Sequence, residues 1–222
     1  MFFWLLRASA RRISPMGIGN YIHALNKEIR CCNKCRLAKT RKNAVCGEGD
    51  LSARILFVAQ APGENEDRER IMFIGPSGMV LNEMLGRIEM DRKDIYMSNL
   101  IKCLLPNNRK PKSDEIETCS RFLEREIEAV KSEILVPLGY YATRYIFGKY
   151  GIPSPSKSEF HSVYGDIFVA GNQEIIPIQH PAALLHSPSL REEMIKNYNN
   201  LRDRARNMEE QSAGFHGKTL PL

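Results

Sequence analysis

Residues 55–67 read ILFVAQAPGENED, and this stretch decides the fold of the 222-residue chain. Five apolar residues in succession, Ile55–Ala59, are typical of a strand that is buried on both faces of a sheet. A polar turn that contains proline and glycine follows directly. Because helices cover both faces of such a strand, this stretch predicts a parallel sheet between two layers of helices.

The same alternation of strand and helix patterns continues along the chain, with no internal repeat and no linker that divides it. Further strand patterns lie at 95–100, 134–138, 167–170 and 175–178. Gly171-Asn172 is typical of a hairpin turn between the last two. Helix patterns lie at 19–29, 78–88, 114–131, 140–147 and 189–208. These patterns predict the α/β class, with three α/β/α layers around a central, mainly parallel sheet.

One domain is expected, over residues 16–205. Residues 1–15 carry three arginines and no acid, which is compatible with an upstream start codon, a disordered extension or a short targeting segment. Residues 206–222 lack periodicity and are expected to form a disordered tail. No apolar run reaches the roughly 18 residues that a membrane helix needs, so we expect a cytoplasmic protein without a membrane partner.

A net charge of +6 and its distribution favour a polyanionic partner. One basic group surrounds the first cysteines and a second follows residue 101. The groups are Lys27, Arg30, Lys34, Arg36, Lys39, Arg41 and Lys42, and then Lys102, Arg109, Lys110 and Lys112. We expect both groups to present positive charge to phosphates, with Arg36 and Arg109 among the contacts.

Six cysteines without a secretory signal favour metal or redox chemistry over a disulfide framework. Cys32 and Cys35 form a C-x2-C pair, whose spacing lets one turn direct two thiolates toward one metal. Cys103 and Cys119 lie far downstream, and Cys119 falls on the apolar stripe of its predicted helix. Four thiolates suit either zinc or a [4Fe-4S] cluster, and their spacing does not separate the two.

Three polar loops follow predicted strands. They are QAPGENED after residue 59, Asn99 with KCLLPNNRKP at the second strand, and QHPAALL after residue 178. Ligands of parallel sheets gather at the carboxyl ends of the strands. The three loops therefore predict one site at that edge of the sheet.

The order of these motifs resembles the type-4 uracil-DNA glycosylases over roughly residues 30–200. The resemblance rests on C-x2-C-x-L from Cys32, ILFVAQAPGENED, MFIGPSG at 72–78, SNLIKC at 98–103, Cys119, Leu138-Gly139 and HPAALL at 180–185. It implies a uracil-DNA glycosylase-like fold and a monofunctional enzyme of base excision repair. Such an enzyme flips uracil out of DNA and hydrolyses its N-glycosidic bond, leaving an abasic site where cytosine had been deaminated.

The resemblance also implies the cofactor and the partners. Its ligand positions fall on Cys32, Cys35, Cys103 and Cys119, and they imply a [4Fe-4S] cluster that pins basic loops against DNA. We expect a monomer that binds uracil-containing DNA, with room for a replication or repair partner such as a sliding clamp.

Site residues are carried over motif by motif. Phe73 matches the aromatic residue that stacks on the base, and Asn99 matches the amide that pairs with N3–H and O4 of uracil. His180 is placed to donate to O2 as negative charge develops there, while Gln60, Ala61 and Gly63 surround the base. Either Leu184 or Leu185 is a candidate wedge for the gap in the duplex, the alternative being that both simply begin a packed helix.

Glu66 is the favoured acid for holding water or stabilising the sugar cation, with Asp67 and Glu64 as alternatives. A solvated acidic turn is the simpler interpretation of these three residues. The chain has Gln60 where the family usually has glutamate, which keeps hydrogen bonding but removes the charge. Two other functions stay open at this point: a glycosylase for a broader range of deaminated bases, and a non-catalytic iron–sulfur protein that binds DNA.

Overall fold

The computed structural model describes residues 17–215, except for the side chains of 209 and 211–215. Within that range, six strands form one sheet in the order β1-β3-β2-β4-β6-β5. The strands are Glu48–Gly49 (β1), Ile55–Ala59 (β2), Tyr96–Asn99 (β3), Ile134–Pro137 (β4), Phe168–Ala170 (β5) and Gln173–Ile175 (β6). The four central strands run parallel, and the edge strands β1 and β5 pair antiparallel to their neighbours. The prediction of a mainly parallel sheet is confirmed.

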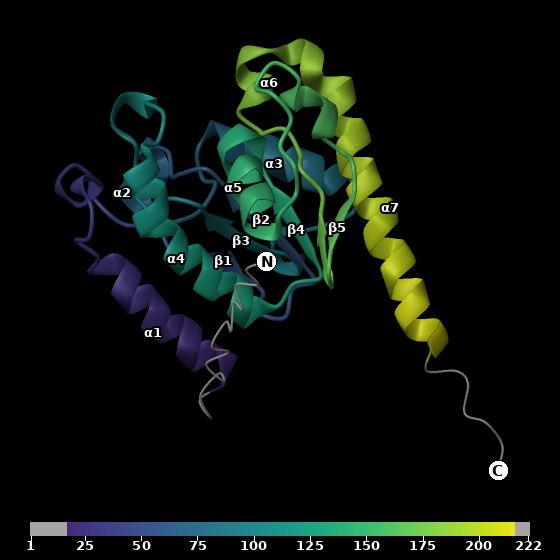
Figure 1. Ribbon diagram of the computed structural model, residues 1–222, viewed down its shortest axis with the longest axis horizontal. Coiled ribbons are helices and arrows are strands. Elements are labelled where there is room, and N and C mark those ends of the chain that lie inside the picture. The colour runs from purple at the N-terminus through teal and green to yellow at the C-terminus, as the bar shows by residue number, and fades with distance from the viewer. Residues whose placement is uncertain (1–16, 216–222) are drawn as a thin grey trace, which may run out of the picture.

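Helices cover both faces of the sheet (Figure 1). They are Ile18–Arg30 (α1), Glu64–Glu69 (α2), Pro76–Arg87 (α3), Ser113–Val130 (α4), Gly139–Tyr150 (α5), Ala183–His186 (α6) and Arg191–Phe215 (α7). Along β2, Leu56 and Val58 pack in the core under α1, α4 and α5, whereas Ile55 and Phe57 pack in the core with α3 and α7. Strand β2 is therefore buried on both faces, as its unbroken apolar run predicts.

Three predicted segments differ from the structure. The last strand, β6, lies at Gln173–Ile175 rather than at 175–178. Residues 64–69 form helix α2 rather than a continuous loop, because Gly63 stands at its N-terminus and three acids lie in its first turn, where the helix dipole favours negative charge. The final helix α7 runs to Phe215 and so crosses the boundary that was predicted at 205–206. Residues 1–15 and 216–222 lie outside the described residues. No helix within residues 17–215 is long and apolar enough to cross a membrane.

The order of the central strands fixes where a ligand can bind. From β2 the chain passes to β3 on one side, and the next strand, β4, lies on the other side of β2. Such a reversal opens a crevice at the carboxyl ends of the two neighbouring strands. The bridge between Leu138 and Ile178 brings the segment after β6 to the same edge.

Candidate active site

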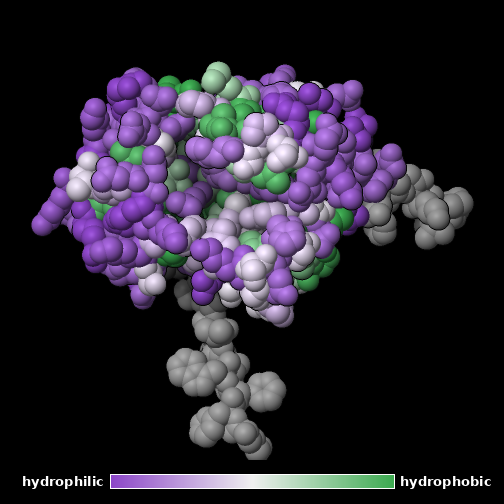
Figure 2. All heavy atoms as spheres, turned by 90° about the horizontal axis from the view of Figure 1, so that it is seen from above, coloured by the Kyte–Doolittle hydropathy of each residue, from purple (hydrophilic) through white to green (hydrophobic). Residues whose placement is uncertain are grey.

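A cleft of about 520 Å³ opens at this edge of the sheet. Its lining residues are Ala59, Gln60, Ala61, Gly63, Glu64, Asn65, Glu66, Met72, Phe73, Gly75, Pro76, Ser77, Asn99, Asn108, His180, Ala182, Leu185 and His186. The view from above in Figure 2 shows a hollow with hydrophobic side chains inside and mostly hydrophilic residues around it. A volume of this size suits one small ligand. The three predicted loops therefore meet at one site.

Asn99 is the last residue of β3, and its side chain is buried in this cleft. Its Nδ2 donates a hydrogen bond to the sulfur of Met72 at 3.0 Å. A buried amide at a strand end is rigidly held and offers both a donor and an acceptor.

Phe73 is buried against the ring of His180, with ring centroids 6.0 Å apart. Its φ of 51° lies in the left-handed region that residues other than glycine seldom adopt. The surroundings hold this conformation: Arg92 donates hydrogen bonds to the carbonyl oxygens of Met72 and Phe73. At Gly78 a Cβ would lie 1.6 Å from the Phe73 oxygen, so only glycine fits there. The MFIGPSG segment is thus held by hydrogen bonds from Arg92 and by close packing at Gly78, and this fixes the ring of Phe73 in one position.

His180 is neutral at neutral pH, because burial lowers its pKa to about 4 against a weaker opposing effect of Glu66. The backbone N–H of Ala182 donates to Nδ1 at 3.2 Å. In a neutral imidazole, a nitrogen that accepts carries no proton, so the proton lies on Nε2. Gly139, with φ +77°, leaves space beside this residue: a Cβ there would lie 3.1 Å from the His180 Cβ. His180 is therefore a fixed, uncharged donor.

Glu66 lines the cleft although it is only 8% exposed. Its Oε1 accepts the backbone N–H of Gly75 at 2.8 Å, which ties α2 to the segment that carries Phe73. A Cβ on Gly63 would come within 2.6 Å of its other carboxylate oxygen. Glycine at positions 63 and 75 therefore leaves the space that the Glu66 carboxylate occupies.

The two alternative acids occupy different positions. Asp67 is buried and accepts hydrogen bonds from the backbone N–H groups of Lys42 and Asn43, at 2.9 Å and 3.1 Å, so it serves as a brace outside the cleft lining. Glu64 is exposed at the rim. The leucines also separate: Leu184 is buried in the core, whereas Leu185 is 46% exposed and lines the cleft.

Met72 and Asn108 are among the lining residues that the sequence did not single out. Met72 has the appearance of an ordinary core residue in sequence, and only the fold brings its sulfur to Asn99. Asn108 reaches the cleft from the loop after β3, in a left-handed conformation with φ 52° that asparagine tolerates. The pair Asn107-Asn108 was a signal for that turn.

The four predicted cysteines line a second, much smaller cavity, together with Ile29, Lys34, Ala38, Arg41, Lys102, Thr118 and Phe122. Arg41 donates to the Cys103 sulfur at 2.9 Å, and the Lys102 N–H donates to the Cys119 sulfur at 3.2 Å. Burial raises the pKa of Cys119 to about 12 and also raises that of Cys103. The donor set fits a group bound by four thiolates, because the four cysteines line one cavity and hydrogen-bond donors face two of the sulfurs. Within residues 17–215, however, no three His, Cys, Asp or Glu side chains are gathered closely enough to hold a single metal ion.

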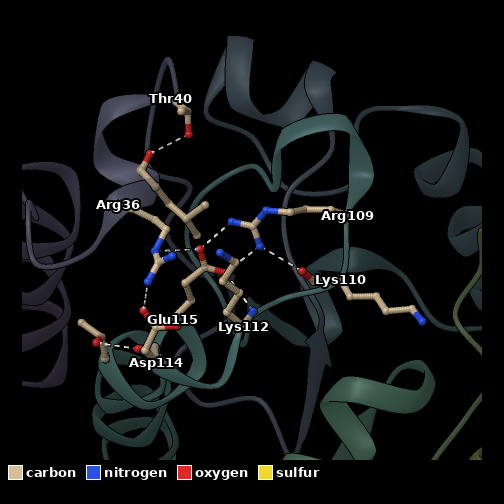
Figure 3. Close-up of polar contacts among 9 residues, drawn as sticks. Arg36, Thr40, Arg109, Lys110, Lys112, Asp114 and Glu115 are labelled. Carbon is tan, nitrogen blue, oxygen red and sulfur yellow. Dashed lines mark hydrogen bonds and ion pairs between the residues drawn. The ribbon is translucent and has the colours of Figure 1, made fainter.

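Ion pairs join the segments around this cavity (Figure 3). Glu115 is fully buried and accepts two hydrogen bonds from Arg109, at 2.5 and 2.8 Å, and one from the Lys112 N–H at 2.9 Å. Arg36 pairs with Asp114 and lies 3.8 Å from Glu115. The Arg109 hydrogen bonds lower the pKa of Glu115 despite the opposing effect of burial. Arg36 and Arg109, which were expected to contact phosphates, are thus paired with carboxylates of this chain.

Lys102 corrects one sequence expectation. It is 1% exposed, and its Nζ contacts Glu126 at 2.6 Å and Ser98 at 2.5 Å, so it does not present charge to a partner. A lysine beside a cysteine in a basic stretch resembles a surface residue in sequence, but here a buried carboxylate compensates its charge. Lys110 and Lys112, in contrast, are exposed.

The α/β fold and a cleft that combines an aromatic ring, a buried amide and a neutral imidazole define an enzyme that binds a planar, hydrogen-bonding ring. Residues 46–202 match the model of the uracil DNA glycosylase superfamily. The chain is similar to type-4 uracil-DNA glycosylases of Sulfurisphaera tokodaii, with 39% identity over 83% of this chain and 84% of the relative, and Archaeoglobus fulgidus, with 40% identity over 75% and 84%. Identity to the relative from Saccharolobus solfataricus is 38%, over 79% of this chain and 82% of that protein. The chain belongs to the uracil-DNA glycosylase superfamily and, within it, to the type-4 uracil-DNA glycosylases.

Proposed function

We propose that the protein flips uracil out of DNA and hydrolyses its N-glycosidic bond, leaving an abasic site and an intact strand. The observation that carries this proposal is the meeting of Phe73, Asn99 and His180 in one cleft, from three separate segments of the chain. A stacked base inside a duplex is out of reach of such a cleft, so the nucleotide must leave the helix first.

Recognition of the base falls to Phe73 and Asn99. The fixed ring of Phe73 offers a stacking face for the pyrimidine. The Asn99 amide can donate to O4 and accept from N3–H of uracil, whereas cytosine presents the opposite pattern at both positions.

His180 acts on the leaving group. Breaking the bond places negative charge on uracil, chiefly at O2 and O4, while positive charge grows on the sugar. The Ala182 N–H donates to Nδ1 and so keeps the proton of the neutral imidazole on Nε2. This Nε2–H group is a preorganised donor for O2. Because the donor gains strength only as charge develops, it stabilises the transition state more than the bound substrate.

Glu66 provides negative charge next to the developing sugar cation and is the candidate for holding the attacking water. Its Oε1 is engaged by Gly75, which leaves Oε2 for this role. Gln60 and Ala61 carry no charge, so the charge of the usual family glutamate is missing here and hydrogen bonding to the base remains.

Contact with DNA involves Leu185 and the exposed lysines. Leu185, rather than the buried Leu184, is the candidate wedge for the gap left by the flipped base. Lys110 and Lys112 lie on the loop that also carries Asn108 to the cleft. Phosphate contacts from these lysines would hold the duplex over the cleft without reading its sequence.

Cys32, Cys35, Cys103 and Cys119 are proposed to hold a [4Fe-4S] cluster. Glycosidic hydrolysis moves no electrons, so the group supplies a structural tie between the segments around residues 32–42 and 103–119. Support comes from the four cysteines that line one cavity and from the similarity to type-4 relatives. A single zinc ion would instead require all four sulfurs about 2.3 Å from one point.

The test is to incubate the purified protein with an oligonucleotide that contains one uracil and then to treat it with alkali. Cleavage only after alkali is expected, because an abasic site breaks under those conditions. The same strand with cytosine should stay intact, and His161→Ala, which changes an exposed residue outside the cleft lining, should behave as the parent. A second strand with hypoxanthine distinguishes a broader glycosylase. DNA binding without any released base would contradict the proposed activity.

A further inference from the structure

Met72 and Asn99 form an isolated polar contact inside the apolar core. Met72 is 1% exposed and Asn99 2%, and the 3.0 Å contact between Nδ2 and Sδ is the one hydrogen bond of the Asn99 side chain among the described residues. The two residues come from different segments, Asn99 from the end of β3 and Met72 from the stretch between α2 and α3. Both line the cleft.

The backbone around Met72 is held from both sides. The carboxylate of Glu48 on β1 accepts its N–H at 3.2 Å, and Nη1 of Arg92 donates to its carbonyl oxygen at 2.9 Å. Arg92 also holds the carbonyl of the strained Phe73. Methionine is ordinarily an adaptable core residue, but here its sulfur is carried on a fixed stretch of chain.

A thioether sulfur can only accept a hydrogen bond, because it carries no proton. The oxygen and nitrogen of an amide lie on opposite sides of its carbon, so turning Nδ2 toward Met72 turns Oδ1 away from it. If the amide were reversed, its oxygen Oδ1 would face the sulfur of Met72. Both atoms are acceptors, so no hydrogen bond would form between them and a buried polar group would be left unsatisfied. The sulfur thus distinguishes the two orientations of Asn99, which differ in whether they match uracil or cytosine.

We propose that Met72 is a positioning residue that fixes the orientation of the Asn99 amide and thereby sharpens the preference for uracil over cytosine. The inference rests on the proposed uracil excision. Met72 acts through Asn99, so its removal changes the discrimination between the two bases more than it changes folding or the affinity for DNA as such.

Two oligonucleotides of one sequence test the proposal, one with 2′-fluoro-2′-deoxyuridine and one with 2′-fluoro-2′-deoxycytidine at the target position. The fluorine disfavours positive charge on the sugar, so binding can be measured with little cleavage. The measured quantity is the ratio of the two Kd values, both determined with the same protein preparation. An unfolded fraction changes both apparent Kd values by the same factor, so it does not change their ratio. Met72→Leu keeps the size and the apolar character but removes the acceptor, and such exchanges are usually tolerated in cores.

We expect Met72→Leu to reduce the preference for the uridine strand over the cytidine strand by about threefold to tenfold, which is the scale of one ordinary hydrogen bond. Met72→Gln, which restores an acceptor, should recover part of the parental ratio. Met84→Leu is the matched control, because Met84 is fully buried in the same core cluster as Met72 but does not line the cleft. Met72→Ile replaces the leucine variant if that variant does not fold.

The possible outcomes test the role of Met72 and the proposed uracil excision separately. A parental ratio in a folded Met72→Leu or Met72→Ile variant overturns the role of Met72 and leaves uracil excision intact. An equal loss of the ratio in Met84→Leu also overturns it, since general loosening of the core would then be the cause. A parent that does not prefer the uridine strand contradicts the proposed function itself, and the inference with it.

Discussion

The cleft and the cysteine cavity are built in two different ways. In the cleft, the functional groups stand on or just beyond strand ends: Gln60 follows β2, Asn99 ends β3, and His180 follows the Leu138–Ile178 bridge. Around the cavity, the cysteines lie on separate loops and on α4, and charged side chains join these segments. A sheet holds the first site in place, whereas ion pairs join the segments around the second, and the proposed cluster would add a further tie.

This difference predicts where each region is sensitive. A change in the cleft removes a chemical function while the sheet stays folded, because the strands are buried on both faces. A change near the cavity removes a tie between segments and should affect stability first. Five substitutions test this contrast.

Cys119→Ala is expected to have the largest effect. It removes a proposed ligand from the middle of α4 and should abolish most iron binding, with a loss of more than about 4 kcal/mol in the free energy of unfolding, as for other losses of a structural metal. Iron analysis and chemical denaturation measure the two quantities. Cys46→Ala is the control, since Cys46 donates to the Asn26 carbonyl and lies outside the cavity lining. Zinc in anaerobically purified parent protein would rule out the cluster.

His180→Ala should lower the single-turnover rate of uracil excision by about 10²–10³, the effect of removing one donor at a developing oxyanion in another reaction class. DNA affinity and thermal stability should remain close to those of the parent, and 5-fluorouracil, a better leaving group, should recover part of the rate. His161→Ala serves as the control. If the variant instead loses binding or folding at an unchanged rate, His180 is a structural residue and the contrast fails.

Glu115→Gln should destabilise the fold by about 1–3 kcal/mol, because the buried carboxylate accepts charge-assisted hydrogen bonds from Arg109. Urea denaturation measures the change, with Glu117→Gln, an exposed position on the same helix, as control. The effect should depend on pH. Because the folded-state pKa of Glu115 lies below its ordinary 4.5, its contribution is present above that value and is lost as the pH falls through the lower folded value. An identical acid profile in parent and variant would contradict this role.

The smallest effect concerns the two kinds of basic residue beside the cavity. Lys110→Ala should weaken binding alike on all DNA sequences and reduce the slope of log Kd against log salt by about one. Arg109→Ala should mainly reduce stability, since its guanidinium is paired with Glu115. Binding titrations at several salt concentrations distinguish them. Equal changes of slope in the two variants would restore Arg109 as a phosphate contact.

Much of the fold followed from local patterns. Strand β2 has the predicted bounds, because a run of five apolar residues is typical of a strand buried on both faces of a sheet. The hairpin at Gly171-Asn172 follows from its turn residues. The short polar helix α2 was missed because it has no apolar stripe to recognise. The predicted end of the last helix was too early, since α7 continues through a polar stretch to Phe215.

The sequence by itself determined the order of strands and helices and the residue types at the strand ends, because each depends on neighbours along the chain. It also gave the C-x2-C pair of Cys32 and Cys35, and the family resemblance added Cys103 and Cys119. The tertiary structure decided which charges face outward. Lys102 and Glu115 resemble surface residues in sequence, yet both are buried. Lys102 pairs with Glu126, 24 positions away, and Glu115 pairs with Arg109 on the preceding loop and lies 3.8 Å from Arg36. It also decided that Leu185 rather than Leu184 reaches the cleft, and that a methionine sulfur faces Asn99. Burial and hydrogen bonding depend on which distant segments meet, and that is fixed only when the sheet and its two helical layers pack together.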